Sequence, residues 1–286
     1  MSKVLLGILG SPRKSGNCEL FVREIHRQLQ GDWQLRLARL PEMDIKPCRA
    51  CYQCLFGDGT CPQQDDFSAV LTALVEAGAY MVAAPTYVLS ANASLKRFLD
   101  RGLSFYAHAD RLWHKPAVGV AIAGIDGMEG FTKLCVESFI KLTMGDLRGA
   151  EVVYGALPGE IFLRGGGQEA ATRLAKAIEG EAPERNADAP ACPVCGGDTF
   201  RFLADGTVRC MLCSSPGTYE LQNGRLAIHT RAGGHELFLT LDGVKRHADW
   251  LRRMKDEFMK KREQLKAVSR QYTEPVEWLR PAGRRP

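Results

Sequence analysis

Residues 3–17 read KVLLGILGSPRKSGN, a short apolar run followed by a loop of glycine, serine and basic side chains. The run at 3–9 has the length and composition of a buried strand. From 16 to 30, Leu20, Ile25 and Leu29 lie near helical spacing, which predicts a helix directly after the loop. A strand, a polar loop and a helix in this order are typical of an α/β fold.

The same alternation continues to about residue 180. Further strands are expected at 33–40, 80–85, 116–124 and 151–157. Further helices are expected at 65–79, at 93–105, between the strand at 116–124 and about residue 148, and at 168–180. Several of these strands are apolar on both faces, which is typical of a parallel sheet covered by helices on both sides. The sequence therefore predicts an α/β fold for residues 1–180.

The remainder of the chain changes in composition. Residues 181–190 are polar and bounded by proline, as expected of a linker. Residues 191–234 contain glycines, turns and short alternating segments, and we interpret them as a second module. A basic tail follows at 235–286, with an amphipathic helix expected from roughly 242 to 270.

Positive charge is concentrated at the end of the chain. The formal net charge is +5, and the segment from Leu241 onward holds 13 Lys and Arg against 7 Asp and Glu. The nearly neutral remainder does not have the footprint of a nucleic-acid-binding surface, so nucleic acid is an unlikely partner. The basic helix is either a solvated face or a contact for a partner. Neither a membrane span of roughly 20 apolar residues nor a signal peptide is recognisable, which favours a cytoplasmic protein.

The loop GSPRKSGN at 10–17 has the composition of a phosphate site. A helix N-terminus at the carboxyl end of a strand offers unpaired N–H groups to an anion. The pattern is neither Walker A nor GxGxxG, so a phosphate monoester is favoured over a nucleoside triphosphate or a dinucleotide. The alternative is a basic surface turn. The side chains that could bind the phosphate are Ser11, Arg13, Lys14, Ser15 and Asn17.

Two further loops strengthen this interpretation. APTYVLSANASLKRFLDR (84–101) and AGIDGMEG (123–130) follow the next two strands of the expected sheet. Together with GSPRKSGN they resemble the three flavin loops of the flavodoxin-like NAD(P)H-dependent FMN reductases, over roughly residues 3–180. The resemblance implies a doubly wound five-stranded parallel sheet, FMN as cofactor, NAD(P)H as an electron donor, and a homo-oligomer, either dimer or tetramer.

The resemblance also implies which residues hold the flavin. Two departures from the family pattern are Cys18, where Thr or Ser is usual, and Leu89, where glycine is common. Tyr87 has an alternative interpretation as a core aromatic residue at a strand end. The implied residues are Ser11, Arg13, Ser15, Asn17 and Cys18 around the phosphate, Pro85, Thr86, Tyr87, Val88 and Asn92 beside the ring, and Gly124 below it.

Four cysteines lie in PCRACYQCLFGDGTCP (47–62), at Cys48, Cys51, Cys54 and Cys61. Three closely spaced thiolates with a fourth beyond them, followed by proline, are similar to ferredoxin-type ligation. A zinc site normally has two Cys-x2-Cys pairs and fits less well, and free thiols or disulfides are the remaining alternatives. The segment resembles the compact motif of the iron–sulfur flavoproteins, which implies a [4Fe-4S] cluster beside FMN.

A second set of four cysteines lies at Cys192, Cys195, Cys210 and Cys213. Two Cys-x2-Cys pairs separated by 14 residues predict a tetrahedral four-sulfur site, as in zinc ribbons. A module of this size has too small a core to fold alone, so a structural zinc is favoured. A redox-active iron of the rubredoxin type is the alternative, because four thiolates suit both metals.

The hypothesis from sequence is an FMN-dependent oxidoreductase or electron-transfer iron–sulfur flavoprotein. Electrons would pass from NAD(P)H or a ferredoxin-like donor through FMN and the cluster to a redox partner protein or a small-molecule acceptor. No side chain is identified as a catalytic acid or base. One alternative is a redox sensor that binds nucleic acid or protein through the ribbon and the basic helix. Another is a dedicated small-molecule reductase or dehydrogenase.

Overall fold

The chain forms an α/β body, a small antiparallel sheet and a long C-terminal helix. The computed structural model describes residues 3–163, 166–181 and 189–279. Contacts between residues divide the chain into two units, Met1–His247 and Ala248–Pro286. Most of the expected linker lies outside the described residues.

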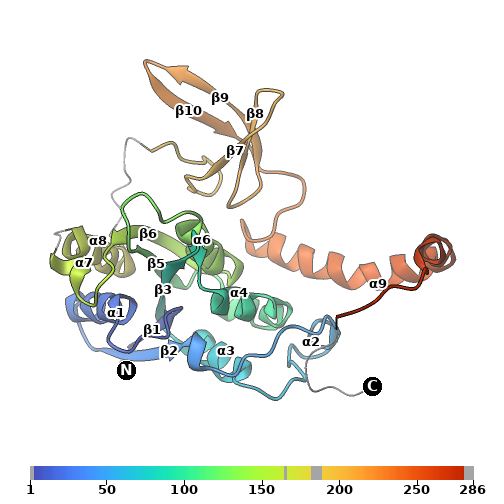
Figure 1. Ribbon diagram of the computed structural model, residues 1–286, viewed down its shortest axis with the longest axis horizontal. Coiled ribbons are helices and arrows are strands. Elements are labelled where there is room, and N and C mark those ends of the chain that lie inside the picture. Colours follow the sequence, from blue (N-terminus) through green and yellow to red (C-terminus); the bar gives the residue numbers. More distant parts are fainter. Residues whose placement is uncertain (1–2, 164–165, 182–188, 280–286) are drawn as a thin grey trace. The chain divides into compact units, whose positions relative to one another are not determined.

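Five parallel strands form the main sheet, in the order β2-β1-β3-β5-β6 (Figure 1). A two-residue strand, β4 (Ser90–Ala91), pairs antiparallel with the end of β3. The order reverses between β1 and β3, and in such sheets ligands bind beyond the carboxyl ends of the strands at this point. The expected flavodoxin-like sheet is confirmed. Its strands are β1 (Lys3–Leu9), β2 (Trp33–Arg39), β3 (Ala79–Tyr87), β5 (Pro116–Ala123) and β6 (Asp146–Tyr154).

Helices cover both faces of this sheet (Figure 1). Alternate residues of β1 face opposite sides, since Leu5 and Leu9 belong to one apolar core and Leu6 and Ile8 to the other. The first core is closed by α1 (Asn17–Gln28) and α8 (Gly166–Glu179), and the second by α3 (Phe67–Glu76), α4 (Ala93–Leu99) and α6 (Thr132–Leu142). Shorter helical segments are η1 (Leu40–Glu42), α2 (Gln53–Phe56), η2 (Gly102–His108), α5 (Ala109–Leu112) and α7 (Glu160–Leu163).

Three expected element boundaries were wrong. The helix expected to reach about 148 ends at Leu142, and β6 begins at Asp146 rather than at 151. Met144 has a left-handed φ of 65°, and the Tyr80 hydroxyl fixes this turn through a 2.8 Å hydrogen bond with Thr143 Oγ1. The helix expected at 93–105 ends at Leu99, and the 3-10 segment η2 follows it.

The C-terminal part contains a four-stranded antiparallel sheet in the order β10-β9-β8-β7. Its strands are β7 (Phe200–Phe202), β8 (Thr207–Cys210), β9 (Pro216–Gln222) and β10 (Arg225–Thr230). The expected basic helix is present as α9 (Leu241–Ser269), followed by η3 (Arg270–Tyr272). Among the described helices, none combines the length and the apolar character that crossing a membrane would require.

Candidate flavin and metal sites

The loop between β1 and α1 carries the predicted phosphate-binding residues. Ser11 is buried, and its Oγ accepts a 3.2 Å hydrogen bond from the Arg13 backbone N–H. Ser15 has a left-handed φ of 52° and donates its backbone N–H to Glu19 Oε2 at 2.9 Å. The N-cap residue of α1 is Gly16, which has no side chain that could accept a hydrogen bond. No side chain therefore caps the first backbone N–H groups of this helix. An uncapped N-terminus beside a serine-rich turn fits a phosphate group.

Two of the predicted phosphate residues are engaged with the protein itself. Asn17 Nδ2 donates to Gly155 O at 2.9 Å, and Asn17 Oδ1 accepts from the Gly159 backbone N–H at 2.7 Å. Arg13 is exposed, and its Nη1 lies 3.5 Å from Ala156 O. Both side chains therefore connect this loop to the segment after β6. Asn17 contributes to the site by positioning the loop.

Cys18 lies in the first turn of α1 but is only 3% exposed. Burial raises the pKa of its thiol to about 12, although the charge of Arg39 acts in the opposite direction. The side chain packs within the apolar core on the α1 face. Cys18 is thus a protonated core thiol.

The second predicted loop follows β3. Tyr87 and Val88 are 42% and 98% exposed, so Tyr87 is not a core aromatic residue. Val88 and Leu89 both have left-handed φ values, 52° and 60°, which turn the chain sharply into β4. Asn92 caps α4, because its Oδ1 accepts the Ser94 backbone N–H at 2.8 Å.

The third loop is joined to the second. The Phe131 backbone N–H donates to Leu89 O at 2.7 Å, and Thr86 Oγ1 donates to Thr132 Oγ1 at 2.8 Å. Gly130 has a φ of 52°, and a Cβ there would collide with Leu89. Leu89, which stands where the family commonly has glycine, therefore joins the second loop to the third through its backbone carbonyl.

Apolar side chains are exposed around these loops, at the carboxyl edge of the sheet. A planar aromatic ring could cover them, since such sites are mostly apolar with a few polar groups. Gly124 opens the third loop, and a Cβ there would make ordinary contact with Ala156. The exposed side chains are Tyr87, Val88, Leu89, Ile125, Met128 and Phe131.

The first cysteine quartet lies on a loop whose ends are tied together. The Lys46 backbone N–H donates to Asp65 Oδ2 at 2.9 Å, and the Asp44 backbone N–H donates to Asp66 Oδ2 at 2.8 Å. Gln63 Nε2 donates to Pro47 O at 3.1 Å. We call residues 44–66 the cluster loop. Its closed neck holds the four cysteines on a compact surface excursion.

The cluster loop curls at two residues with left-handed φ, Ala50 at 50° and Tyr52 at 57°. The Ala50 backbone N–H donates to Cys48 Sγ at 3.5 Å. Cys48 and Cys51 are exposed, whereas Cys54 and Cys61 are partly buried. Burial raises the pKa of Cys54, and the charges of the other three cysteines add to this effect. The four thiols are therefore close enough to interact electrostatically.

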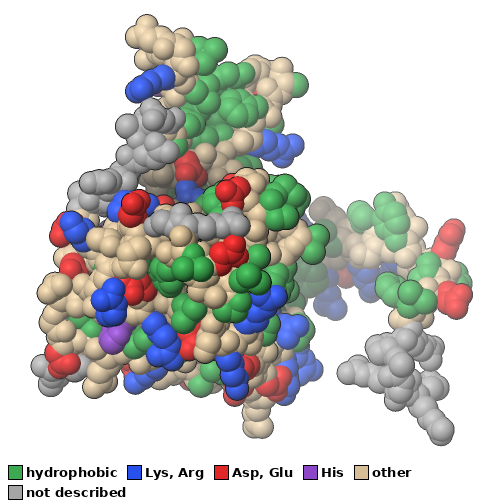
Figure 2. Space-filling model, turned by 60° about the vertical axis from the view of Figure 1, so that its left-hand side comes forward, with side chains coloured by type: hydrophobic (Ala, Val, Ile, Leu, Met, Phe, Trp, Pro, Cys, Tyr) green, Lys and Arg blue, Asp and Glu red, His purple; other side chains and the backbone are tan. Residues whose placement is uncertain are grey.

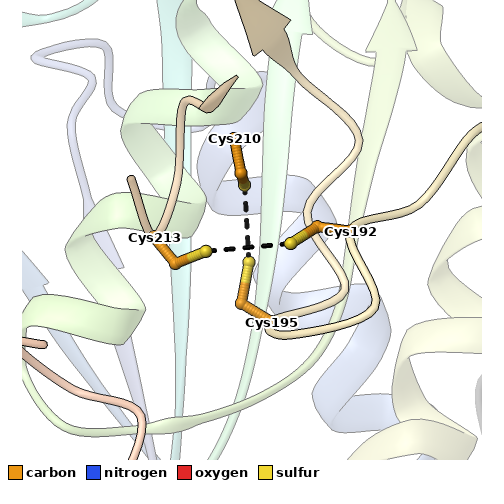
Figure 3. Close-up of side chains that lie close together, drawn as sticks. All are labelled: Cys192, Cys195, Cys210 and Cys213. Carbon is orange, nitrogen blue, oxygen red and sulfur yellow. Dashed lines mark hydrogen bonds between the residues drawn. The ribbon is translucent and has the colours of Figure 1, made fainter. Parts of the chain in front are cut away.

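The sulfur spacing differs between the two quartets. Among the described His, Cys, Asp and Glu side chains, the one group of three or more whose ligand atoms all lie within 4.8 Å of one another is Cys192, Cys195, Cys210 and Cys213 (Figure 3). Zn–S bonds of about 2.3 Å in a tetrahedron place sulfurs about 3.8 Å apart. The Cys192–Cys213 and Cys195–Cys210 sulfurs are separated by 3.7 and 3.6 Å. The second quartet thus has the size of a site for one metal ion.

Among the described residues, the sulfurs of the first quartet do not form such a group. In a cubane cluster each thiolate binds a different iron atom, so the four sulfurs lie farther apart than around a single ion.

Neighbouring donors support charge on the second quartet. Hydrogen bonds with Cys195 and Cys210 lower the pKa of Cys213, and hydrogen bonds with Cys210 and Cys213 raise the pKa of Cys195. Metal ions bind cysteines as thiolates, so binding of a metal ion here would release the protons of these thiols. The hydroxyls of Ser215 and Thr230 lie 3.1 Å from Cys213 Sγ and 3.0 Å from Cys192 Sγ.

Residues 4–156, more than half of the chain, match the family described as NADPH-dependent FMN reductase. This range contains all three candidate flavin loops and the cluster loop. The chain belongs to the NADPH-dependent FMN reductase family. Members of this family are NAD(P)H-dependent flavin oxidoreductases, so the chain is an enzyme of this class.

Curated relatives of this FMN reductase include proteins named for a cluster. The chain is 29% identical over 161 residues to an iron-sulfur flavoprotein of Archaeoglobus fulgidus, covering 54% of this chain and 70% of that protein. It is 33% identical over 98 residues to an iron-sulfur flavoprotein of Methanocaldococcus jannaschii, covering 34% of this chain and 50% of that one.

One solved structure resembles this FMN reductase over nearly its whole length. A flavone reductase superposes with a TM-score of 0.71 and 18% sequence identity, covering 97% of this chain and 99% of the other. At this identity the likeness concerns the fold. It extends beyond residues 4–156, so the small antiparallel sheet and the C-terminal helix are part of an architecture found elsewhere.

Residues that hold the phosphate loop were missed from sequence. Arg39, at the end of β2, donates to Ser11 O at 3.1 Å and Arg13 O at 2.8 Å, and it pairs with Glu19 at 2.6 Å. Burial alone would raise the pKa of Glu19, but hydrogen bonds from Ser15, Arg23 and Arg39 lower it to about 2. Arg39 lies more than 20 residues from the phosphate loop in the sequence, so no local sequence pattern predicts its contacts with Ser11 and Arg13.

The surface of the FMN reductase agrees with its nearly neutral body. On the face drawn in Figure 2, blue and red side chains are intermixed over the body, with hydrophobic side chains between them. That face shows no continuous basic stripe among its coloured atoms.

Proposed function

We propose that this FMN reductase is an iron–sulfur flavoprotein that passes electrons between NAD(P)H, FMN and a [4Fe-4S] cluster. The observation that carries the proposal is the cluster loop, a closed loop that carries four cysteines in the pattern Cys-x2-Cys-x2-Cys-x6-Cys-Pro. The curated relatives named iron-sulfur flavoproteins support the same assignment.

The phosphate of FMN is assigned to the loop after β1. Ser11 and Ser15 and the uncapped first turn of α1 would bind it, with Arg13 at the exposed side. Asn17 and Arg39 position the loop through their backbone contacts. Cys18 contributes packing alone because it is buried and protonated.

The flavin ring is assigned to the exposed apolar edge between the second and third loops. Pro85, Thr86, Tyr87, Val88 and Asn92 would flank it, with Gly124 beneath. Thr86 is fixed by Thr132, so the ring would meet a prepared surface. When bound, FMN supplies the exchange between two-electron hydride chemistry and one-electron transfer.

The cluster is assigned to Cys48, Cys51, Cys54 and Cys61, and a structural zinc ion to Cys192, Cys195, Cys210 and Cys213. The second assignment follows from sulfur spacings near those expected for a single tetrahedral ion. Iron at this second site is the alternative that metal analysis distinguishes. Electrons leaving the cluster would reduce a redox partner protein or a small-molecule acceptor. The protein would act as a homo-oligomer in the cytoplasm.

Anaerobic reduction by NADPH and NADH tests the electron route. We expect the flavin spectrum to bleach, the electron paramagnetic resonance signal of a reduced cluster to grow in, and a one-electron acceptor protein to be reduced. Cys54→Ser should keep FMN and NAD(P)H oxidation but lose the cluster signal and transfer to that acceptor. Cys135→Ser, outside both quartets, is the matched control and should behave as wild type.

A second candidate is a dedicated reductase of a planar organic compound. The exposed side chains Tyr87, Val88, Ile125 and Phe131 favour it, because they offer an apolar platform. The flavone reductase that shares the fold is named for such a substrate. Sustained reduction of a planar two-electron acceptor, equally fast in Cys54→Ser and wild type, would favour this candidate over electron transfer through the cluster.

A further inference from the structure

Arg101 is a buried arginine at the neck of the cluster loop. Its side chain is 1% exposed and pairs with Asp65, whose side chain is 0% exposed. Arg101 Nη1 also lies 3.5 Å from Lys46 O, and the guanidinium carbon lies 4.2 Å from the centroid of the Phe67 ring. The guanidinium is thereby held in one place.

Two nitrogens of this guanidinium form no hydrogen bond with the described part of the chain. Arg101 Nε and Nη2 are buried without a hydrogen-bond partner among the described residues. An unsatisfied buried donor costs about 1–3 kcal/mol, and more when it is charged. Burial lowers the pKa of Arg101, but interactions with Asp65 and then with Cys61 outweigh it and leave the pKa raised. The sulfur of Cys61 therefore lies beside a guanidinium with unused donors.

A second unused donor lies in η2. Ser104 is 0% exposed, and its Oγ forms no hydrogen bond with the described part of the chain. It lies beside Cys54, where it lowers the pKa of the thiol against the larger effect of burial. The cluster loop approaches η2 closely at Gly59, since a Cβ at this residue would collide with Ala107.

We propose that Arg101 and Ser104 are positioning residues for the cluster, whose unused N–H and O–H groups donate to the sulfurs of Cys61 and Cys54 when the cluster is bound. The inference rests on the proposed function, because it needs a cluster in the loop. It assigns these two residues the outer-shell role that hydrogen-bond donors have around metal sites.

The expected consequence is a higher reduction potential. A cluster ligated by four thiolates carries net negative charge, and reduction adds one more electron. Because Arg101 is paired with Asp65, its net charge contributes little, and the hydrogen bonds to the sulfurs stabilise the more negative state and favour reduction. Burial keeps this interaction from being screened by salt as an exposed charge would be.

A redox titration of the anaerobically purified holoprotein, followed by electron paramagnetic resonance, tests the assignment. In Arg101→Gln we expect the equilibrium constant for cluster reduction to fall about tenfold, which is 59 mV for a one-electron couple. Arg101→Lys keeps the charge but not the planar fork and should fall less. Ser104→Ala should fall a few-fold. Arg97→Gln removes an exposed arginine of α4, four residues before Arg101, and should match wild type.

The outcomes separate the two levels of the account. A cluster of unchanged potential in both Arg101→Gln and Ser104→Ala would overturn the positioning role while leaving the cluster in place. A wild-type protein without acid-labile sulfide would overturn the proposed function, and the positioning role with it. If Arg101→Gln does not fold, Arg101→Lys and Ser104→Ala still decide, because each changes the donors more gently.

Discussion

Asp65 and Arg101 form an ion pair that is almost completely withdrawn from solvent. Asp65 also accepts the backbone N–H groups of Lys46 at 2.9 Å and Phe67 at 3.2 Å. One carboxylate therefore fixes the start of the cluster loop, the start of α3 and the guanidinium beside the cysteines. This relationship joins the cluster loop to the flavin-binding body.

Removal of the carboxylate should be costly. Asp65→Asn leaves Arg101 as a buried, unpaired cation, for which the expected loss is about 3–5 kcal/mol in the free energy of unfolding. Asp100→Asn is the matched control, because it breaks the exposed Lys96–Asp100 pair, where about 0–1 kcal/mol is expected. Denaturant titration of both variants measures the difference. Equal losses would mean that the buried pair contributes no more than the surface one.

Glu19 should make stability depend on pH in the acid range. Its pKa is about 2 in the folded protein, below the ordinary 4.5, so its contribution is complete above about pH 4.5 and is lost as the pH falls towards 2. At about 1.4 kcal/mol per pKa unit, Glu19→Gln should cost on the order of 3–4 kcal/mol at pH 7. That difference should vanish near pH 2. Glu42→Gln is the control, because it removes a carboxylate whose side chain is 48% exposed and should cost less stability at pH 7 than Glu19→Gln.

Gly59 should be required for the cluster loop to sit on η2. Gly59→Ala adds a Cβ that collides with Ala107 at a φ of 90°, so we expect a loss of about 1–3 kcal/mol and fewer iron atoms retained per chain. Gly31→Ala is the control for backbone strain alone, since it has a φ of 86° and no atom within 4 Å of the new Cβ. Iron content similar in the two variants would contradict the close approach.

Cys18 should be chemically inert in the folded protein. With a pKa of about 12, almost none of its thiol is ionised at pH 8, and the thiolate is the reactive form. Mass spectrometry after iodoacetamide treatment should find Cys18 unmodified until the protein is unfolded in denaturant. Cys18→Ser should retain FMN. Rapid modification of the native protein would show that the thiol is exposed or ionised.

The sequence predicts much of the fold because buried parallel strands carry a strong local signal. The apolar runs at 3–9, 80–85 and 116–124 became β1, β3 and β5 with small shifts at their ends. The start of β6 was not predicted, because residues 146–150 are partly exposed at the sheet edge and lack a continuous apolar run. Local pattern gives no register for such an edge strand.

The sites divide in the same way. The spacing of Cys192, Cys195, Cys210 and Cys213 predicts their convergence, because each Cys-x2-Cys pair is a local turn. The pair of His235 Nε2 and His247 Nδ1, 2.7 Å apart, was not foreseen from sequence, where His235 has no neighbour at ligand spacing. The Asp65–Arg101 pair was also missed, since 36 residues separate its partners. Such contacts depend on tertiary packing.

The most direct test of the account is metal and sulfide analysis of the anaerobically purified protein, with its visible spectrum. We predict about four iron and four sulfide per chain, as a [4Fe-4S] cluster requires, together with one zinc and a flavin spectrum. About five iron and no zinc would place iron at the second quartet. Two zinc and no sulfide would contradict the central claim, and the protein would then be a flavin reductase with two structural metal sites.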